Sequence, residues 1–269
     1  MKKVFLYLLT TIMSITTFSS CLGDNESTSS QDNAYCIIGS EGGINYAKLY
    51  YLELTNKDRF KDYESGDVML LNYKINYSSI ITIPGTSTQI FEAEYAAPSS
   101  ENYVFKKSEH LNVNYGNVDL ESKNPNIFTS FSLEGNGHRA SKYFSDRWLI
   151  NYQAKYTKEQ TATIELFYDE EQQFDADGKE LPENTYIVDV KLNISGTPNS
   201  SSEATNKEQY VVANMNRLRT TLHPAEINDE NITYVKILFR YFKENTNGSP
   251  TLTLYDPGNN TGIDYYVEK

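Results

Sequence analysis

Apolar and polar residues alternate along several stretches of the chain. Between positions 148 and 156, every second residue is Trp, Ile, Tyr, Ala or Tyr, and the residues between them are mostly polar. A period of two places the two sets of side chains on opposite faces of a β-strand. The same pattern recurs at positions 71–77, 111–115, 162–168, 186–194 and 235–241. Each stretch therefore predicts a half-buried strand.

Turn-forming residues separate these stretches, as expected for an all-β fold. The clusters are Ser65-Gly66-Asp67, Pro84-Gly85, Gly135-Asn136-Gly137, Asp177-Gly178, Asn247-Gly248 and Asp256-Pro257-Gly258. Gly, Asn and Asp adopt the backbone angles that tight turns need. One stretch differs: between Glu208 and Leu222, apolar residues recur at intervals of four, three and four, which favours a helix, although Tyr210-Val211-Val212 equally favours a strand. Both readings stay open at this point.

The first 20 residues resemble a bacterial lipoprotein signal. Lys2 and Lys3 precede an apolar run, and small residues stand before Cys21. Cleavage before Cys21 would leave a cysteine carrying acyl chains such as palmitate, which would hold the protein on a membrane without spanning it. An ordinary secretory signal is the alternative, but Phe18-Ser19-Ser20 lacks the usual Ala-x-Ala-like ending. Asp24 and Glu26 resemble the acidic signal for surface display in bacteria of the Bacteroides type.

Size and charge limit the possible partners. Removal of residues 1–20 leaves 269 − 20 = 249 residues, enough for two compact domains. The formal charge of −12 includes Lys2 and Lys3, so the mature chain stands near −14. Such a charge repels phosphate backbones and anionic headgroups, so we predict no nucleic-acid partner. If Cys21 is lipidated, Cys36 has no partner for a disulfide, and its apolar surroundings predict a buried side chain.

Composition divides the mature chain into two domains. We predict a polar tether at 21–33, a first β domain at 34–120, a connecting region at 121–145 that is rich in Asn, Ser, Gly and Lys, and a second β domain at 146–269. Residues Gly196 to Lys207 are too polar to pack and predict a loop.

Two runs carry a resemblance to a known family. They are Gly66-Asp67-Val68-Met69-Leu70-Leu71-Asn72-Tyr73 and Asp146-Arg147-Trp148-Leu149-Ile150-Asn151-Tyr152. With the lipoprotein cysteine and the polar tether, this order is similar to the NigD-like lipoproteins of Bacteroides relatives. The resemblance implies a small OB-like β-barrel followed by an antiparallel β-sandwich. It implies no activity, because the family has none to carry over.

The sequence lacks the common catalytic motifs. Gly-x-Ser-x-Gly, His-Glu-x-x-His and the phosphate-binding loop are all missing. The three histidines, His110, His138 and His223, are scattered, so we predict no zinc site and no cofactor. A hydrolase acting on glycans would need two carboxylates across a cleft, which sequence spacing cannot identify.

Two patterns predict candidate ligand sites. Asp175-x-Asp177-Gly178-x-Glu180 resembles part of a calcium loop, but Asn184 stands where the bidentate Glu belongs, so we favour a β-hairpin turn. Aromatic side chains suit sugar rings, and the candidates are Trp148, Tyr50, Tyr51, Tyr265 and Tyr266. Alternation places Trp148 on the inward face, which favours a role in the core.

These observations predict a non-catalytic lipoprotein of the outer membrane, facing the cell surface or the periplasm. It would act as a binding or accessory component, with a protein or a polysaccharide as its partner. A glycan-binding module or a glycan hydrolase is the second hypothesis. An assembly subunit of the fimbrial kind is the third, and it would show an unpaired edge strand.

Overall fold

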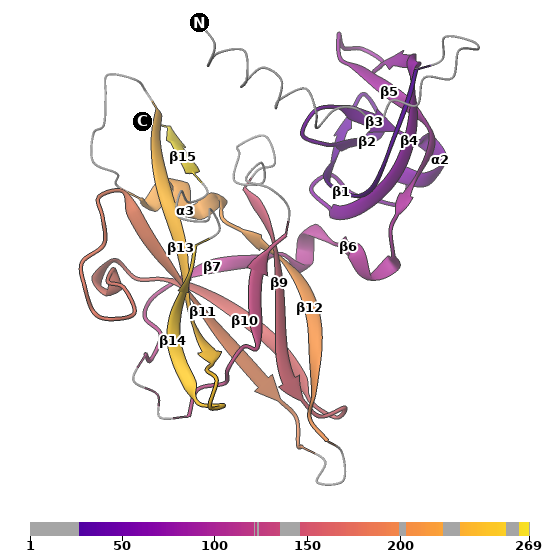
Figure 1. Cartoon of the computed structure of the whole chain (residues 1–269). Helices are drawn as coiled ribbons and strands as arrows, with labels where there is room; N and C mark the ends of the chain where they lie inside the picture. Colours follow the sequence, from indigo (N-terminus) through magenta and orange to yellow (C-terminus); the bar gives the residue numbers. More distant parts are fainter. Residues whose placement is uncertain are drawn as a thin grey trace, which may run out of the picture.

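The chain is built almost entirely of strands in the computed structural model (Figure 1), so the all-β prediction is confirmed. The structure describes residues 27–120, 122, 124–134, 146–198, 203–222, 232–256 and 264–268. The predicted signal at 1–20 and the predicted lipidation site Cys21 lie outside these residues. Within the described ranges, no helix has the length and hydropathy to cross a bilayer.

Five strands of the first domain close into a ring. They are β1 (Thr28–Glu41), β2 (Ile44–Lys48), β3 (Glu53–Thr55), β4 (Val68–Thr82) and β5 (Gln89–Pro98). Their pairing runs β1-β2-β3-β5-β4 and returns from β4 to β1. Only β3 and β5 pair in parallel within the ring, and helix α2 (Lys57–Phe60) joins β3 to β4. Assignment of this ring to the OB type stays a prediction.

Alternate residues of these strands fill the interior of the ring. The core cluster is mainly aliphatic and contains Ala34, Cys36, Ile38, Ala47, Leu49, Leu54, Phe60, Met69, Leu71, Tyr73, Ile75, Ala93 and Ala96. Cys36 is buried, as predicted, and burial raises the pKa of its thiol far above the ordinary value. The tether is shorter than predicted, because β1 begins at Thr28 and its first residues already pair with β4.

The second sheet contains nine described strands. They are β7 (Leu111–Tyr115), β8 (Ser130–Leu133), β9 (Arg147–Tyr156), β10 (Thr161–Tyr168), β11 (Thr185–Ser195), β12 (Thr205–Asn214), β13 (Ile232–Glu244), β14 (Pro250–Tyr255) and β15 (Asp264–Glu268). The order is β14-β13-β11-β10-β7-β12-β9-β8, and β15 also pairs with β13.

The second domain is not antiparallel throughout, which differs from the expected antiparallel β-sandwich. Strand β7 pairs in parallel with both β10 and β12, and β11 pairs in parallel with β13. Alternation reports which face of a strand is buried but carries no information on the direction of its neighbours. Strand β7 was also placed in the first domain by the 34–120 boundary, but it pairs only within the second sheet. By strand pairing, the change of sheet falls between Phe105 and Leu111.

The segment from Glu208 to Leu222 contains both predicted structures in succession. Its first part continues strand β12 to Asn214, and its second part forms the short helix α3 (Asn216–Thr221). The apolar spacing of this segment arises because the end of β12, the following turn and α3 all face one core cluster, which contains Met215, Leu218 and Leu222 and against which Val211 packs. The polar loop predicted from Gly196 is shorter than expected, because β12 begins at Thr205.

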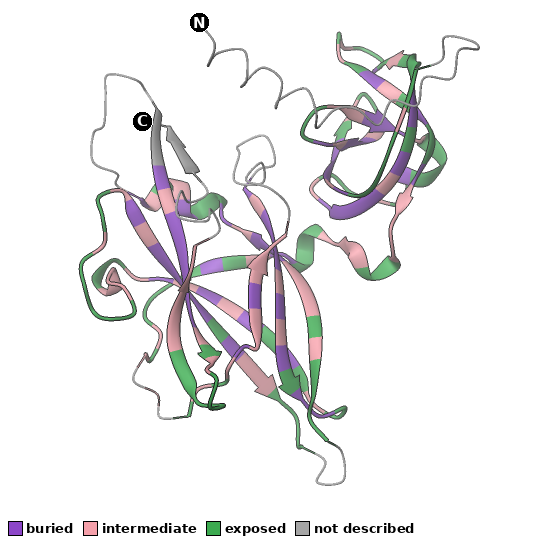
Figure 2. Cartoon of the chain, in the orientation of Figure 1, coloured by how far each residue is buried: buried purple, intermediate pink, exposed green. Residues whose placement is uncertain are grey.

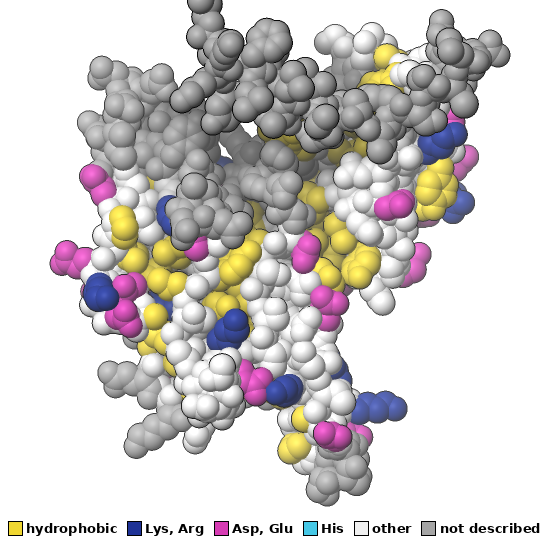
Figure 3. All heavy atoms as spheres, in the orientation of Figure 1, with side chains coloured by type: hydrophobic (Ala, Val, Ile, Leu, Met, Phe, Trp, Pro, Cys, Tyr) yellow, Lys and Arg dark blue, Asp and Glu magenta, His cyan; other side chains and the backbone are white. Residues whose placement is uncertain are grey.

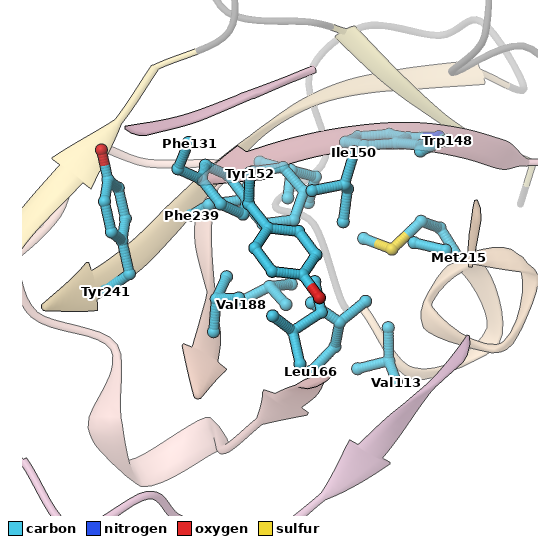
Figure 4. Close-up of a cluster of buried hydrophobic side chains, with 14 of the residues drawn as sticks. Val113, Phe131, Trp148, Ile150, Tyr152, Leu166, Val188, Met215, Phe239 and Tyr241 are labelled. Carbon is cyan, nitrogen blue, oxygen red and sulfur yellow. The ribbon is translucent and has the colours of Figure 1, made fainter. Parts of the chain in front are cut away.

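The second sheet wraps around one aromatic core. Trp148 on β9 lies 5.7 Å from Phe239 on β13, measured between ring centroids, although these strands are not neighbours in the sheet. Figure 4 shows Trp148, Ile150 and Tyr152 pointing into the same cluster as Val188 and Phe239. Edge-to-face ring contacts of this kind stabilise a core beyond simple burial. Figure 2 shows the buried positions alternating along the strands.

The two domains share a small apolar interface. Ile37, Val68 and Leu70 of the ring form one cluster with Leu149 and Val212 of the second sheet. At its border, the hydroxyl of Tyr35 donates to the carbonyl of Arg147 (2.7 Å), and the rings of Tyr103 and Tyr210 meet edge to face at 5.3 Å. These contacts bury the outward faces of β1 and β4 against β9 and β12.

Candidate functional site: a cavity under the 117–126 strap

A cavity of about 340 Å³ lies on the outer face of the second sheet. Its roof is the segment 117–126, which we call the strap; residues 121 and 123 of the strap are not described. The strap leaves β7 at Gly116, whose positive φ of 134° suits glycine. It is fastened at its far end, where the amide of Asn126 donates to the carbonyl of Leu192 (3.1 Å). The volume is in the range of small-molecule sites.

The floor of the cavity comes from strands β10, β11 and β13. Residues that alternate with core residues point outward here: Phe167, Asp189, Lys191, Asn193, Arg240 and Phe242. Asp189, for example, stands between the core residues Val188 and Val190. The roof adds the amides of Asn117, Asn124 and Asn126, the hydroxyl of Ser122 and the carboxylate of Asp119, together with the apolar residues Val118, Leu120 and Pro125. The lining is therefore mixed, with polar groups beside aliphatic side chains and two aromatic rings in the floor.

A buried ion pair forms part of this floor. Asp189 is 2% exposed and Arg240 is 1% exposed. The guanidinium of Arg240 donates from Nε to Oδ1 (2.6 Å) and from Nη2 to Oδ2 (2.9 Å) of Asp189. It also donates to the carbonyls of Phe174 (2.7 Å) and Gln172 (2.9 Å), and it lies 4.9 Å from the centroid of the Phe174 ring. Arg240 thus fastens the 172–174 segment onto the sheet.

The environment of Asp189 has opposing effects on its protonation. Burial raises the pKa of the Asp189 carboxyl above its ordinary value, and the facing guanidinium of Arg240 lowers it; burial has the larger effect. A buried acid with a raised pKa is a common feature of catalytic sites. Here, however, both carboxylate oxygens accept hydrogen bonds from Arg240 and the side chain is buried, so the carboxylate serves the ion pair.

A second cavity of about 440 Å³ adjoins the first. The two share Asn117, Val118, Asp119, Leu120 and Leu252. The second cavity is closed on its other side by Gln172, Phe174, Asp175, Ala176 and Gly178. The strap therefore forms a wall that is shared by two adjoining cavities on one face of the domain.

The predicted calcium candidates belong to the turn beside the second cavity. Oδ1 of Asp175 accepts from the backbone N–H groups of Asp177 and Lys179, both at 2.8 Å, and Asp177 pairs with the ammonium of Lys179 (3.3 Å). Glu180 forms a bridge with Phe174. The side chains therefore shape a turn around Gly178, which is the reading that the sequence favours. In the described part of the chain, no three acidic, His or Cys residues are grouped to hold a metal ion.

The predicted aromatic candidates lie elsewhere. Trp148 is buried in the core, as its alternation predicts. Tyr50 and Tyr51 are 45% and 86% exposed in the loop between β2 and β3, where their rings meet edge to face at 4.3 Å. The side chains of Tyr265 and Tyr266 lie outside the described residues. None of these residues lines the cavity under the strap.

Sequence reasoning missed the residues that do line this cavity. One signal was available, since Asp189 and Arg240 are single charges inside the apolar runs 186–190 and 237–242. A lone acid and a lone base in two buried strands predict an ion pair, because an unpaired charge there would be costly. The sequence of the strap did not predict a cavity, because Asn, Asp and Ser are common in any polar loop.

The predicted histidines do not form a site in the described residues. His110 is 8% exposed, and its Nε2 lies 3.3 Å from the carbonyl of Phe105. Burial lowers the pKa of His110 below its ordinary value, and the charge of Arg147 lowers it further. His138 and His223 lie outside the described residues.

Comparison with known proteins gives only structural neighbours. No family model matches the sequence, and no curated protein matches it. An uncharacterized protein from Parabacteroides merdae is similar over 82% of this chain and 94% of its own, with 12% identity and a TM-score of 0.47. A protein of unknown function from Bacteroides vulgatus is similar over 85% of this chain and 90% of its own, with 10% identity and a TM-score of 0.46.

A third neighbour bears on the resemblance described above. A NigD-like immunity protein from Bacteroides caccae is similar over 90% of this chain and 98% of its own, with 11% identity and a TM-score of 0.40. A NigD-like protein is thus among the structural neighbours, as the sequence resemblance predicts. At these identities and TM-scores the NigD-like likeness carries no argument about function, which is therefore argued from the cavity.

Proposed function

We propose that this protein is a lipid-anchored, non-catalytic binding protein of the cell envelope, and that the cavity under the strap takes one or two residues of a glycan. The lining of this cavity is the observation that carries the proposal. Asn117, Asn124 and Asn193 line this cavity together with Phe167 and Phe242. Sugar hydroxyls both donate and accept hydrogen bonds, as amides do, and the apolar face of a sugar ring suits a flat aromatic surface.

The charge balance of the cavity supports an uncharged or weakly charged ligand. Asp189 and Arg240 neutralise each other, which leaves Asp119 and Lys191 as the other charged residues of the lining. A strongly anionic ligand such as a nucleic acid would also meet a chain of net charge −12. On the face drawn in Figure 3, Lys and Arg side chains are scattered among Asp and Glu rather than gathered in one basic area.

A glycan hydrolase is the alternative, and the raised pKa of Asp189 is the observation that favours it. A general acid must present a proton to the leaving oxygen. Protonation of Asp189 would leave Arg240 buried and uncompensated, and its oxygens already face the guanidinium. Binding without hydrolysis therefore accounts better for this arrangement.

Titration calorimetry of the detergent-solubilised full-length chain with a panel of neutral and acidic oligosaccharides tests the binding function. We expect at least one neutral oligosaccharide to bind and to be recovered uncleaved. Asn193→Ala should weaken its binding about fivefold to tenfold, which corresponds to the loss of one hydrogen bond. Asn206→Ala, on β12 and outside the cavity lining, is the matched control and should bind normally. Release of a shorter sugar would instead support the hydrolase.

The membrane anchor has its own test. We expect the full-length chain to take up radiolabelled palmitate in a bacterial host and to sediment with membranes, because acyl chains at Cys21 hold it there. Cys21→Ser should abolish both. Label in the Cys21→Ser protein, or equal sedimentation of the two proteins, would contradict lipidation at this residue. Protease treatment of intact cells would then separate display on the surface, where the protein is degraded, from a periplasmic orientation, where it survives.

A further inference from the structure

Strand β14 ends the order of the second sheet, and no described strand pairs with its outer side. Its sequence, Pro-Thr-Leu-Thr-Leu-Tyr, contains no charged residue. Exposed edges are usually protected by charged side chains, bulges or very short strands, because their free N–H and C=O groups attract other strands. Apart from Pro250 at its start, β14 has none of these protections.

The neighbouring strand shows which groups of β14 point outward. On β13, the carbonyl of Phe242 and the N–H of Glu244 bond with Phe128, so they face away from β14. In an antiparallel pair, alternate residues bond across the ladder. Lys243 and Tyr241 therefore bond with Thr251 and Thr253, their partners in register. The N–H and C=O groups of Leu252 and Leu254 consequently point to the free side.

The other end of the sheet is closed in a different way. Strand β8 has four residues, and the hydroxyl of Tyr255 accepts from the N–H of Leu133 (3.2 Å). Phe128, just before β8, bonds to β13 through both its N–H and its C=O. The first domain closes its five strands into a ring. Among the described strands, β14 is thus an end strand of six residues that carries no charge and has no strand paired on its outer side.

The space beside β14 has the dimensions and charge for a short peptide. Leu252 lines the second cavity, of about 440 Å³, whose opposite walls are the strap and the 172–178 segment. The carboxylate-bearing residue Asp175 lines this cavity, and no Lys or Arg is among its described lining residues. Backbone N–H groups lower the pKa of Asp175, which keeps its carboxylate ionised. A segment carrying a Lys or Arg would complement this charge.

We infer that β14 accepts a short extended segment of a partner protein as an added antiparallel or parallel strand. The backbone of that segment pairs with Leu252 and Leu254, and a basic side chain of the segment lies in the cavity beside Asp175. A second copy of this chain is a poorer occupant, because each copy carries a net charge of −12. This surface would serve a protein partner, whereas the cavity under the strap would serve a glycan, and neither role depends on the other.

Selection of a displayed library of random twelve-residue peptides on the full-length chain tests this inference. We expect enriched peptides to share β-branched residues at alternate positions and at least one Lys or Arg. Leu254→Pro should weaken their binding about tenfold, because proline lacks the outward N–H while leaving the bonds to β13 intact. Asp175→Asn should weaken it less, since Asn retains the acceptor that shapes the turn and loses only the charge.

Thr253→Pro is the matched control for the direction of the backbone groups. It removes an N–H that bonds to Tyr241, so it should destabilise the domain, whereas Leu254→Pro should unfold at nearly the parent temperature. The inference is overturned if no peptide is enriched, if enriched peptides bind Leu254→Pro as tightly as the parent, or if sedimentation shows that a second copy occupies β14. Oligosaccharide binding by Leu254→Pro is measured in parallel. It should be unchanged, so failure of the peptide site can be distinguished from failure of the glycan site.

Discussion

The two domains solve the problem of sheet edges differently. The first closes five strands into a ring around a mainly aliphatic core. The second wraps a longer sheet around an aromatic core and leaves β14 unpaired on its outer side in the described structure. It also covers its outer face with polar segments that enclose two cavities. The second domain therefore carries both of the binding surfaces proposed above.

Each domain contains one residue whose signal can report its unfolding. Trp148, the one tryptophan of the chain, is in the core of the second domain, and Cys36, the one cysteine besides Cys21, is in the core of the ring. In a Cys21→Ser background, tryptophan fluorescence follows unfolding of the second domain. Reaction of the Cys36 thiol with a maleimide follows unfolding of the first. The predictions below use these two signals to test the comparison, from the largest effect to the smallest.

Removal of Arg240 should have the largest effect. Arg240→Ala leaves Asp189 buried without its partner and frees the 172–174 segment, so we expect a loss of about 3–5 kcal/mol in the unfolding free energy of the second domain. Urea titration followed by Trp148 fluorescence measures it. The Asp189→Leu, Arg240→Met double variant should recover most of the loss, because an apolar pair of similar size avoids the buried charge. A single variant as stable as the parent would show that the pair is not buried.

Matched core truncations should separate the two domains. Leu71→Ala in the ring and Leu166→Ala in the second domain each remove a fully buried side chain, at a cost of about 2–5 kcal/mol. We expect Leu71→Ala to move the thiol signal and Leu166→Ala to move the fluorescence signal. If either substitution shifts both transitions equally, the domains unfold as one cooperative unit, and the comparison between them fails.

The interface should contribute less than either core. A double-mutant cycle of Tyr103→Ala and Tyr210→Ala should give a coupling of about 0.5–1.5 kcal/mol, which is typical of an edge-to-face aromatic pair. Urea titrations of the four proteins measure it. The pair of Tyr103→Ala with Tyr51→Ala, whose ring is exposed far along the chain in the β2–β3 loop, serves as the control and should be additive. A coupling of zero for the first pair would mean that the two rings are not in contact.

Acidification should weaken the junction between the domains slightly. Burial lowers the pKa of His110, so the folded protein binds a proton there less readily than the unfolded chain. The stability from His110 is complete above the unfolded pKa of about 6.5 and is lost as the pH falls through that value toward the folded pKa. We expect His110→Gln to reduce the pH dependence of unfolding below about pH 6.5. His138→Gln is the control, and an equal effect of both variants would contradict the assignment.

Particular residues show how much of the fold can be predicted from the sequence. Alternation correctly assigns Trp148, Ile150 and Tyr152 to one buried face, and apolar neighbours correctly predict burial of Cys36. The same alternation fails for β7, because a strand of five residues buries one face equally well in either domain. It also fails for strand direction, since β7 lies parallel to both of its neighbours.

Local sequence patterns could not predict the candidate site. Its roof, the strap, and its floor on β11 and β13 are separated by about 60 to 120 residues in the sequence, so only the folded sheet brings them together. Asn117, Asn193 and Phe242 are ordinary residues in their own segments. These residues line one cavity only because the strap lies over the outer face of the second sheet.

The sequence by itself determined that this chain folds into strands and which residues face the core. It could do so because these properties depend on neighbouring residues, through side-chain periodicity and local composition. Only the tertiary structure decided the order and direction of the strands, the pairing of Asp189 with Arg240, the cavity under the strap and the position of β14 at the end of the described sheet. These depend on contacts between distant segments, which are set by the packing of whole sheets.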